Sequence, residues 1–217
     1  MEEFFDTRAL GYEAHMAQYP DAAYWWTVLE AQLPRTDSTT RILDLGCGPG
    51  LELDYIVRRQ PHAQITCIDV SERMLAQLRL NHASLLSQLD LIKGSYFEQN
   101  WPERYFDHAV ACETMHHWLF SAKLNLYEAI RRALKDGGTF IDYDYFVRSE
   151  EEKKLAGEYS ELAESGQIRK DRSYHIDIPF TVVREMEVLK AAGFRQVRLI
   201  EERCSSESSA GMIVAEK

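Results

Sequence analysis

The sequence predicts an α/β fold with a doubly wound, mostly parallel sheet, and two observations carry this prediction. Short apolar runs alternate with helical patterns along most of the 217 residues, which is typical of repeated βαβ units. The first run, at residues 42–45, leads into a glycine-rich turn and then a helical pattern. Glycines at that position allow a tight turn and let a ligand approach the backbone closely.

The same patterns place the elements in order. The first expected helix stops before Pro61, the second has Ser71 as its N-cap, the third ends in a basic turn before Gly137, and the last ends at Gly193. Strands are expected near residues 41–45, 64–68, 89–93, 106–112, 138–143, 196–200 and 209–215, with helices near 51–60, 71–87, 122–135 and 181–192.

Composition excludes several classes of protein. The formal net charge of -10 at pH 7 argues against a broad basic face for nucleic acid. We see no signal peptide and no transmembrane run, and the four cysteines show no paired or metal-ligand spacing. We therefore expect a cytoplasmic protein with reduced thiols that binds neither nucleic acid nor a membrane.

The glycine turn itself, Gly46–Gly50, narrows the choice of ligand. A dinucleotide fingerprint needs a small residue where this chain has Leu51, and Pro49 removes an N–H that a pyrophosphate would use. A P-loop needs Lys and Ser or Thr where Glu52 follows. S-adenosylmethionine (SAM) carries a sulfonium and an ammonium but no phosphate, so the acid at the strand end, Asp44, suits it electrostatically.

These residues resemble motif I of the class I SAM-dependent methyltransferases. The resemblance extends to a second strand that ends in Asp69, to a fourth strand over 104–112, and to the turn into the fifth strand over 133–141, where Asp136 replaces the usual proline. It implies a Rossmann-like, seven-stranded, mostly parallel sheet with an antiparallel last strand, helices on both faces and a small helical lid.

The resemblance also implies one domain over residues 1–217. Within it we expect an N-terminal helical cap at 1–36, a SAM-binding core at 37–146, a lid insertion at 147–179, and a C-terminal helix and strands at 180–217. Cap and lid are expected to close over the strand ends and to determine substrate choice. The two tryptophans of the cap, Trp25 and Trp26, either cover the pocket or attach helices to the sheet.

The family's motifs transfer cofactor roles to named positions. Asp69 is expected to bind the two ribose hydroxyls of SAM, and Tyr12 to lie near its carboxylate. The complete set of expected cofactor contacts is Tyr12, Asp44, Gly46, Cys47, Gly48, Gly50, Asp69, Val70, Met74, Ser95, Tyr96 and Glu113, with S-adenosylhomocysteine (SAH) as the product.

The loop after the fourth strand, residues 113–118, is expected to face the transferred methyl group. Methyl transfer needs alignment more than acid–base chemistry, but a base helps if the acceptor is a hydroxyl or a protonated amine. The catalytic candidates are Glu113, His116 and His175, and the expected substrate contacts are Met115, His116, Asp144, Arg172, Tyr174 and His175. We expect His117 to pack structurally. We expect no metal, because His15, His116, His175 and Asp144 lack a ligand spacing.

The leading hypothesis is therefore a SAM-dependent methyltransferase that acts on an O, N or S atom of a small molecule, as a monomer or homodimer. Two alternatives stay open: a non-catalytic SAM-binding regulatory protein, and an enzyme that forms carboxymethyl-SAM.

Overall fold

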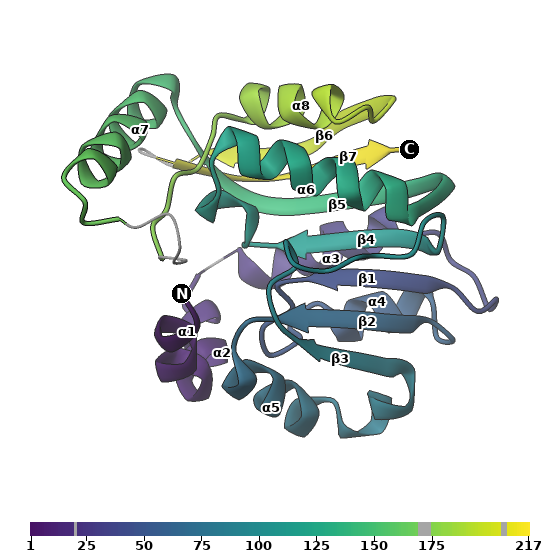
Figure 1. The fold of residues 1–217 in the computed structure, drawn as a ribbon. Coiled ribbons are helices and arrows are strands. Elements are labelled where there is room, and N and C mark those ends of the chain that lie inside the picture. The colour runs from purple at the N-terminus through teal and green to yellow at the C-terminus, as the bar shows by residue number, and fades with distance from the viewer. Residues whose placement is uncertain (20, 169–174, 205–207) are drawn as a thin grey trace.

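The computed structural model describes residues 1–19, 21–168, 175–204 and 208–217, and it contains the predicted sheet (Figure 1). Seven strands lie in the order β3-β2-β1-β4-β5-β7-β6. Pairing is parallel from β3 to β5, whereas β7 runs antiparallel to both β5 and β6. The strands are β1 Arg41–Leu45, β2 Gln64–Asp69, β3 Leu89–Lys93, β4 Phe106–Cys112, β5 Leu134–Val147, β6 Gln196–Cys204 and β7 Ser208–Glu216. The predicted fold class, including the antiparallel last strand, is confirmed.

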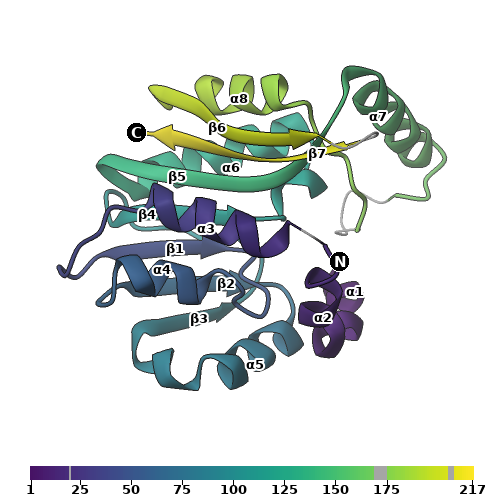
Figure 2. The same ribbon diagram turned by 180° about the vertical axis from the view of Figure 1, so that it is seen from behind.

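Helices cover both faces of this sheet (Figures 1 and 2). Side chains of α6 and α8 pack on one face and side chains of α3, α4 and α5 pack on the other. The α-helices are α1 Glu2–Arg8, α2 Tyr12–Met16, α3 Ala22–Gln32, α4 Leu53–Arg59, α5 Glu72–Asn81, α6 Phe120–Ala133, α7 Ser149–Glu164 and α8 Val182–Ala191, and the 3-10 turns are η1 Ala9–Gly11, η2 Ala83–Gln88 and η3 Met115–His117. No helix in the described ranges is long and apolar enough to cross a membrane.

Strand β1 shows how the core is divided. Leu43 and Leu45 point to the face covered by α6 and α8, while Ile42 points to the other, and all three are fully buried. Successive side chains of a strand alternate between faces, so a continuous apolar run is what a strand buried on both sides requires. The central strand is thus held in register by packing on both sides, which places the loop that follows it.

Several element boundaries differ from the prediction, and two of these differences are informative. Strand β5 begins at Leu134, which pairs with Phe106. Helix α6 therefore ends before the glycine pair at 137–138, where the strand was expected to start. Gly137 lies inside the strand with φ +75°, where a left-handed residue bends it. The second expected helix ends at Asn81 and continues as a 3-10 turn, whereas the predicted cap is correct: Ser71 Oγ accepts a hydrogen bond from the N–H of Met74 at 3.0 Å.

The N-terminal segment divides into two parts. Helices α1 and α2 lie beyond the carboxyl ends of the strands (Figure 1), but α3 packs on the sheet between α4 and β5. Trp25 is buried and stacks on Tyr143 with 5.2 Å between ring centroids, and Trp26 meets the same ring edge-on. The expectation that all of 1–36 forms a cap is therefore wrong for α3, whose tryptophans attach it to the sheet.

Candidate functional site

The glycine loop after β1 is shaped by close contacts on one side and open space on the other. Gly46 has φ +69°, and a Cβ there would lie 2.5 Å from Thr114 Oγ1. Gly48 has φ +49°, and nothing would lie within 4 Å of its Cβ. A side chain at Gly46 would collide with the protein, whereas one at Gly48 would enter empty space. Gly48 thus leaves room for a ligand against the backbone.

Asp69, at the end of β2, is held beside this loop by backbone donors. Its Oδ2 accepts from the N–H of Gly48 at 2.9 Å and its Oδ1 accepts from the N–H of Ser71 at 2.8 Å. Burial raises the pKa of Asp69 to about 6, although these hydrogen bonds lower it. The carboxylate is therefore positioned before any ligand arrives, and it is ionised above about pH 6.

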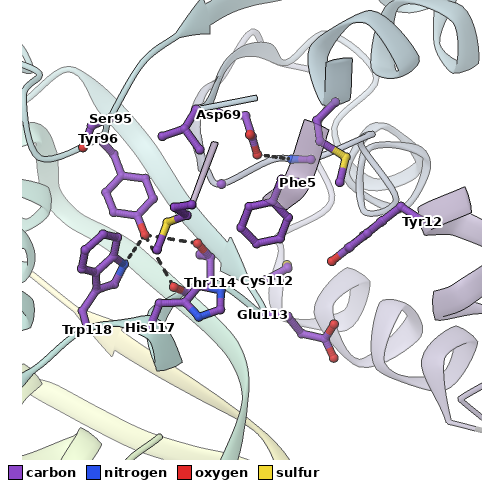
Figure 3. A pocket seen from close by; sticks show the side chains of 15 residues that line it. Phe5, Tyr12, Asp69, Ser95, Tyr96, Cys112, Glu113, Thr114, His117 and Trp118 are labelled. Carbon is purple, nitrogen blue, oxygen red and sulfur yellow. Dashed lines mark hydrogen bonds between the residues drawn. The ribbon is translucent and has the colours of Figure 1, made fainter. Parts of the chain in front are cut away.

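A cavity of about 610 Å³ opens between this loop, the end of β4 and α1 (Figure 3). We call it the glycine-loop cavity; it is lined by Met1, Phe5, Tyr12, Gly46, Gly48, Asp69, Val70, Met74, Ser95, Tyr96, Cys112, Glu113, Thr114, His117 and Trp118. One wall is fixed by a chain of contacts, in which Trp118 Nε1 donates to the Tyr96 hydroxyl and that hydroxyl lies 3.2 Å from Thr114 Oγ1.

Most of the expected cofactor contacts line this cavity, and three do not. Those on its wall are Tyr12, Gly46, Gly48, Asp69, Val70, Met74, Ser95, Tyr96 and Glu113. Cys47 lines a smaller neighbouring cavity with Glu52. Gly50 packs inward, since a Cβ there would lie 2.7 Å from Leu53 Cδ1. Asp44 lies beneath the loop, 1% exposed, outside the lining of the three described cavities.

The position of Asp44 corrects the electrostatic argument made for it. Neither of its carboxyl oxygens has a hydrogen-bond partner within the described chain. Burial first, and the nearby Glu52 second, raise the pKa of Asp44 well above its ordinary value, and burial raises the pKa of Glu52 to about 7. Both shifts disfavour the negative charge that was to attract a sulfonium. Asp44 supports the loop from below.

Glu113 presents its side chain at the end of β4 through an unusual backbone conformation. It has φ +52°, in the left-handed region that glycine normally occupies, and its N–H donates to the carbonyl of Tyr143 at 2.7 Å. Its Oε1 accepts from the Tyr143 hydroxyl at 3.1 Å. Burial, followed by the charge of Asp144, raises the pKa of Glu113 to about 7. A carboxyl group of this kind can gain or lose a proton near neutral pH.

A second, wider cavity of about 1760 Å³, the lid cavity, lies beyond Glu113 and is open to solvent. Four residues line both cavities: Phe5, Tyr12, Glu113 and His117. The lid cavity is completed by Phe4, Arg8, His15, Met16, Tyr19, Asp21, Ala22, Trp25, His116, Tyr143, Tyr145, His175, Asp177, Arg203, Cys204, Ser208, Ser209 and Ala210. The two spaces therefore meet at one boundary formed by the end of β4 and the N-terminal helices.

His116, a predicted catalytic residue, lines the lid cavity and is oriented by Asp144. Its Nδ1 lies 2.6 Å from Asp144 Oδ1, and its backbone N–H donates to Asp144 Oδ2 at 2.8 Å. Burial acts to raise the pKa of Asp144, but the adjacent His116 lowers it below its ordinary value. A carboxylate on Nδ1 favours the tautomer in which Nε2 carries the free lone pair. Asp144, expected to touch substrate, instead holds His116 in place.

His117 was expected to pack structurally, yet it is the histidine that borders both cavities. Its Nδ1 lies 3.0 Å from Oδ1 of Asp177, a residue of the segment before α8. Burial lowers the pKa of His117, which favours the neutral ring. The adjacent histidines were visible in the sequence, but nothing in it indicated that the 3-10 turn would direct both toward the cavities.

The other expected acceptor residues have mixed positions. His175 lines the lid cavity, and its ring stacks on Phe4 with 3.5 Å between centroids. Met115 is fully buried in the core and contacts neither cavity, because the turn that exposes the histidines points it inward. Tyr174 and Arg172 lie outside the described residues. The lists of expected contacts did not include Phe5, Thr114, Trp118 or Asp177, although Thr114 and Trp118 belong to the loop expected at the site.

Comparisons with known proteins agree with this architecture. Residues 43–140 match the methyltransferase domain family. The chain is 30% identical over 164 residues to malonyl-[acyl-carrier protein] O-methyltransferase of Geobacter sulfurreducens, which covers 75% of this chain and 58% of that protein. It is 47% identical over 51 residues to trans-aconitate 2-methyltransferase of Rhodopseudomonas palustris, covering 24% of this chain and 20% of the relative. The chain thus spans less than two thirds of these relatives.

Solved structures share the fold at low identity. A putative O-methyltransferase of Nostoc punctiforme superposes with a TM-score of 0.72 at 20% identity, over 98% of this chain and 60% of the other. Phosphoethanolamine N-methyltransferase 2 of Haemonchus contortus, solved with SAM, superposes with a TM-score of 0.65 at 17% identity. The match covers 88% of this chain and 51% of the other. At these identities the likeness supports the fold alone.

Proposed function

We propose that the protein transfers a methyl group from SAM to an O, N or S atom of a small molecule and releases SAH, and the match of residues 43–140 to the methyltransferase domain family supports this. One observation carries the proposal. The cavity lined by most of the expected cofactor residues opens onto a second cavity, and Glu113 and His117 stand at their boundary. Donor and acceptor held in these two spaces would meet there.

The residues of the glycine-loop cavity fit SAM. The free side of Gly48 accepts a ligand against the backbone, and the preorganised carboxylate of Asp69 can accept hydrogen bonds from two ribose hydroxyls. Tyr96, Phe5 and Trp118 provide apolar surface around it. When bound, SAM supplies a methyl carbon that is already activated by the adjacent sulfonium.

The protein's own contribution is alignment, exclusion of water and proton removal. Phe5 and Trp118 close the donor side against solvent, which supports an in-line geometry at the boundary. His116, with Nδ1 held by Asp144, directs its Nε2 to the acceptor side. Either His116 or Glu113 can accept the proton of a hydroxyl, ammonium or thiol acceptor.

A small acceptor is favoured by the shape and charge of the protein. Helices α1 and α2 lie over the strand ends, and the lid cavity is lined partly by their side chains. The net charge of -10 offers no general attraction for a phosphate backbone. Of the relatives named above, the trans-aconitate 2-methyltransferase supports a small acceptor, whereas the other acts on malonyl-[acyl-carrier protein].

Ligand binding followed by product analysis tests the proposal. SAM or SAH at about 100 times its Kd should raise the melting temperature by roughly 5–10 °C, and NADH should not. Incubation with methyl-labelled SAM and a metabolite extract should then yield SAH and a labelled small molecule. Absence of a shift with SAM and SAH contradicts the cofactor assignment. Binding with SAM left intact favours a regulatory protein, and carboxymethyl-SAM favours the other chemistry.

A further inference from the structure

Three side chains converge on one point at the inner end of the lid cavity. His116 and His117 come from η3, and Asp177 comes from the segment before α8. Asp177 Oδ1 lies 3.0 Å from His117 Nδ1 and 3.7 Å from His116 Nε2. One ligand atom from each of the three lies within 4.8 Å of the other two. Two imidazoles and a carboxylate form a donor set typical of divalent transition metals.

The state of His117 indicates that this convergence is more than an ion pair. Its side chain is 3% exposed, and its Nδ1 makes no aligned hydrogen bond within the described residues despite the nearby Asp177 oxygen. A carboxylate oxygen at this distance but out of line satisfies the buried nitrogen only in part. His117 Nδ1 and Asp177 Oδ1 lie close together without pointing at each other. Two ligands of a common ion have the same arrangement.

The surroundings of the cluster are those of a supported metal site. His116 Nδ1 is held by the buried carboxylate of Asp144, the arrangement that orients a metal-bound histidine through its second nitrogen. The N–H of Ile178 donates to the carbonyl of His116 at 2.8 Å, which holds the Asp177 segment against the histidine turn. Asp177 is 45% exposed toward the open side, so a ligand has a path of entry.

We propose that His116 Nε2, His117 Nδ1 and Asp177 Oδ1 bind one divalent first-row transition ion such as Zn²⁺ in the acceptor cavity. Ligands about 2.1 Å from such an ion lie about 2.9–3.4 Å from one another, so the observed distances need only a small contraction. His175, with Nε2 3.8 Å from the same Asp177 oxygen, offers a further nitrogen donor close by. All three residues line the lid cavity, so a substrate held there would be able to complete the coordination of the ion.

This site deepens the proposed function and rests on it for its chemistry. The ion would select an acceptor that binds through two adjacent oxygens, such as a hydroxyl next to a carbonyl, carboxylate or second hydroxyl. Coordination would lower the hydroxyl pKa. Because His116 Nε2 would then hold the ion, Glu113 rather than His116 would take the proton at the boundary. The oxygen lone pair would then form the O–C bond while the C–S bond breaks. The electrons of the C–S bond stay on sulfur, which becomes the neutral thioether of SAH.

Cobalt binding tests the site without any assay of activity. Tag-free, metal-stripped protein is titrated with Co²⁺, and visible d–d absorption reports coordination. The wild type should bind one Co²⁺ per chain, and Zn²⁺ should displace it. Asp177→Asn and His117→Gln should each weaken binding by more than about 100-fold. Asp144→Asn should weaken it by roughly 10–100-fold through loss of support to His116.

Matched controls keep the outcome interpretable. Asp21→Asn and His15→Gln change a carboxylate and an imidazole of the same cavity outside the cluster, and Co²⁺ affinity should be unchanged. Because Asp177 is half-exposed and outside any helix or strand, Asp177→Asn should keep the wild-type melting temperature. Absence of saturable Co²⁺ binding, or equal affinity in wild type and Asp177→Asn, overturns the proposal. The SAM-induced melting shift, measured on the same stripped samples, reports separately on the cofactor assignment.

Discussion

The glycine-loop side and the lid side of the site are built in different ways. Asp69 is held by two backbone N–H groups at the end of a buried strand, and Gly46 is pressed against Thr114. By contrast, α1 contains no buried residue, and polar pairs such as Glu2 with Lys93 at 2.9 Å join it to the sheet. Segments with few buried contacts open at low cost in free energy. The glycine-loop side is therefore a rigid scaffold, whereas the lid side can change its conformation.

This difference predicts that substitutions on the lid side alter turnover, whereas those on the loop side alter cofactor affinity or stability.

The largest effect is expected on the acceptor side, from His116→Gln. Loss of the imidazole should lower kcat by about 10²–10⁴, the usual contribution of a positioned acid or base. The Kd for SAM should stay within about twofold, because His116 lines the lid cavity and not the glycine-loop cavity. Steady-state kinetics with an acceptor identified from the labelled extract, together with calorimetric SAM binding, measure both. An equal loss of SAM affinity would contradict the separate roles of the two cavities.

On the loop side, the two glycines should separate stability from binding. Gly46→Ala combines a left-handed φ with a Cβ 2.5 Å from Thr114 Oγ1, so the free energy of unfolding should fall by about 2–4 kcal/mol. Gly48→Ala has the backbone strain without the collision, so it should lose only about 1–2 kcal/mol. Its Cβ should instead weaken SAM binding. Urea denaturation and calorimetry distinguish the two, and equal destabilisation would contradict the geometry.

Asp69→Ala should weaken SAM binding by about 1.5–3 kcal/mol, or roughly 10–150-fold, through loss of charge-assisted hydrogen bonds. The turnover number at saturating SAM should change little, since Asp69 lines only the donor side. Calorimetry gives the first quantity and initial rates give the second. A variant that binds SAM like the wild type would remove Asp69 from the cofactor site.

Because burial raises the pKa of Asp69 to about 6, SAM affinity should depend on pH. The carboxylate needed for the ribose hydroxyls is present above that pKa, so affinity should be constant near pH 7–8 and fall up to tenfold per unit below pH 6. For the free protein the sign is opposite: a raised acid pKa means that stability decreases as pH rises from about 4 to 6. Titration of SAM at several pH values checks this, and Asp69→Ala should show a flat profile.

The smallest effect is expected from Asp6→Ala, which removes a lid contact. Asp6 Oδ1 accepts from Ser71 Oγ at 2.6 Å at the start of α5. Its loss should weaken SAM binding by less than about 1 kcal/mol, the usual value of an exposed hydrogen bond, and speed release of SAH. Stopped-flow measurement of SAH release tests it. Unchanged release would indicate that α1 does not gate the donor cavity.

Much of the donor side was predictable because its residues occur together in short motifs at strand ends. Gly46, Gly48 and Asp69 follow strands whose apolar pattern identified them, and parallel strands bring their carboxyl ends to one edge. Asp44 belongs to the same motif, yet it lies buried beneath the loop and outside the described cavities. Its burial depends on which face of β1 it occupies and on Glu52 beside it, neither of which the motif specifies.

The acceptor side resisted prediction for a different reason. His117 and Met115 are two residues apart in one short turn, and only the turn's geometry decides that the histidine lines the cavities while the methionine enters the core. Asp177 approaches His117 from sixty positions further along the chain, and α1 brings Phe5 from the N-terminus. No local spacing encodes such encounters.

The amino-acid pattern alone was therefore enough to predict the sheet, its helical layers and the strand ends that border the glycine-loop cavity. Period-two and helical patterns, caps and glycines act over a few residues, so they can be recognised in isolation. Only the tertiary structure decided that His116, His117 and Asp177 meet, and that α3 packs on the sheet while α1 and α2 cover the strand ends. Those contacts join distant segments, and their free energy depends on shape and burial that exist only after folding.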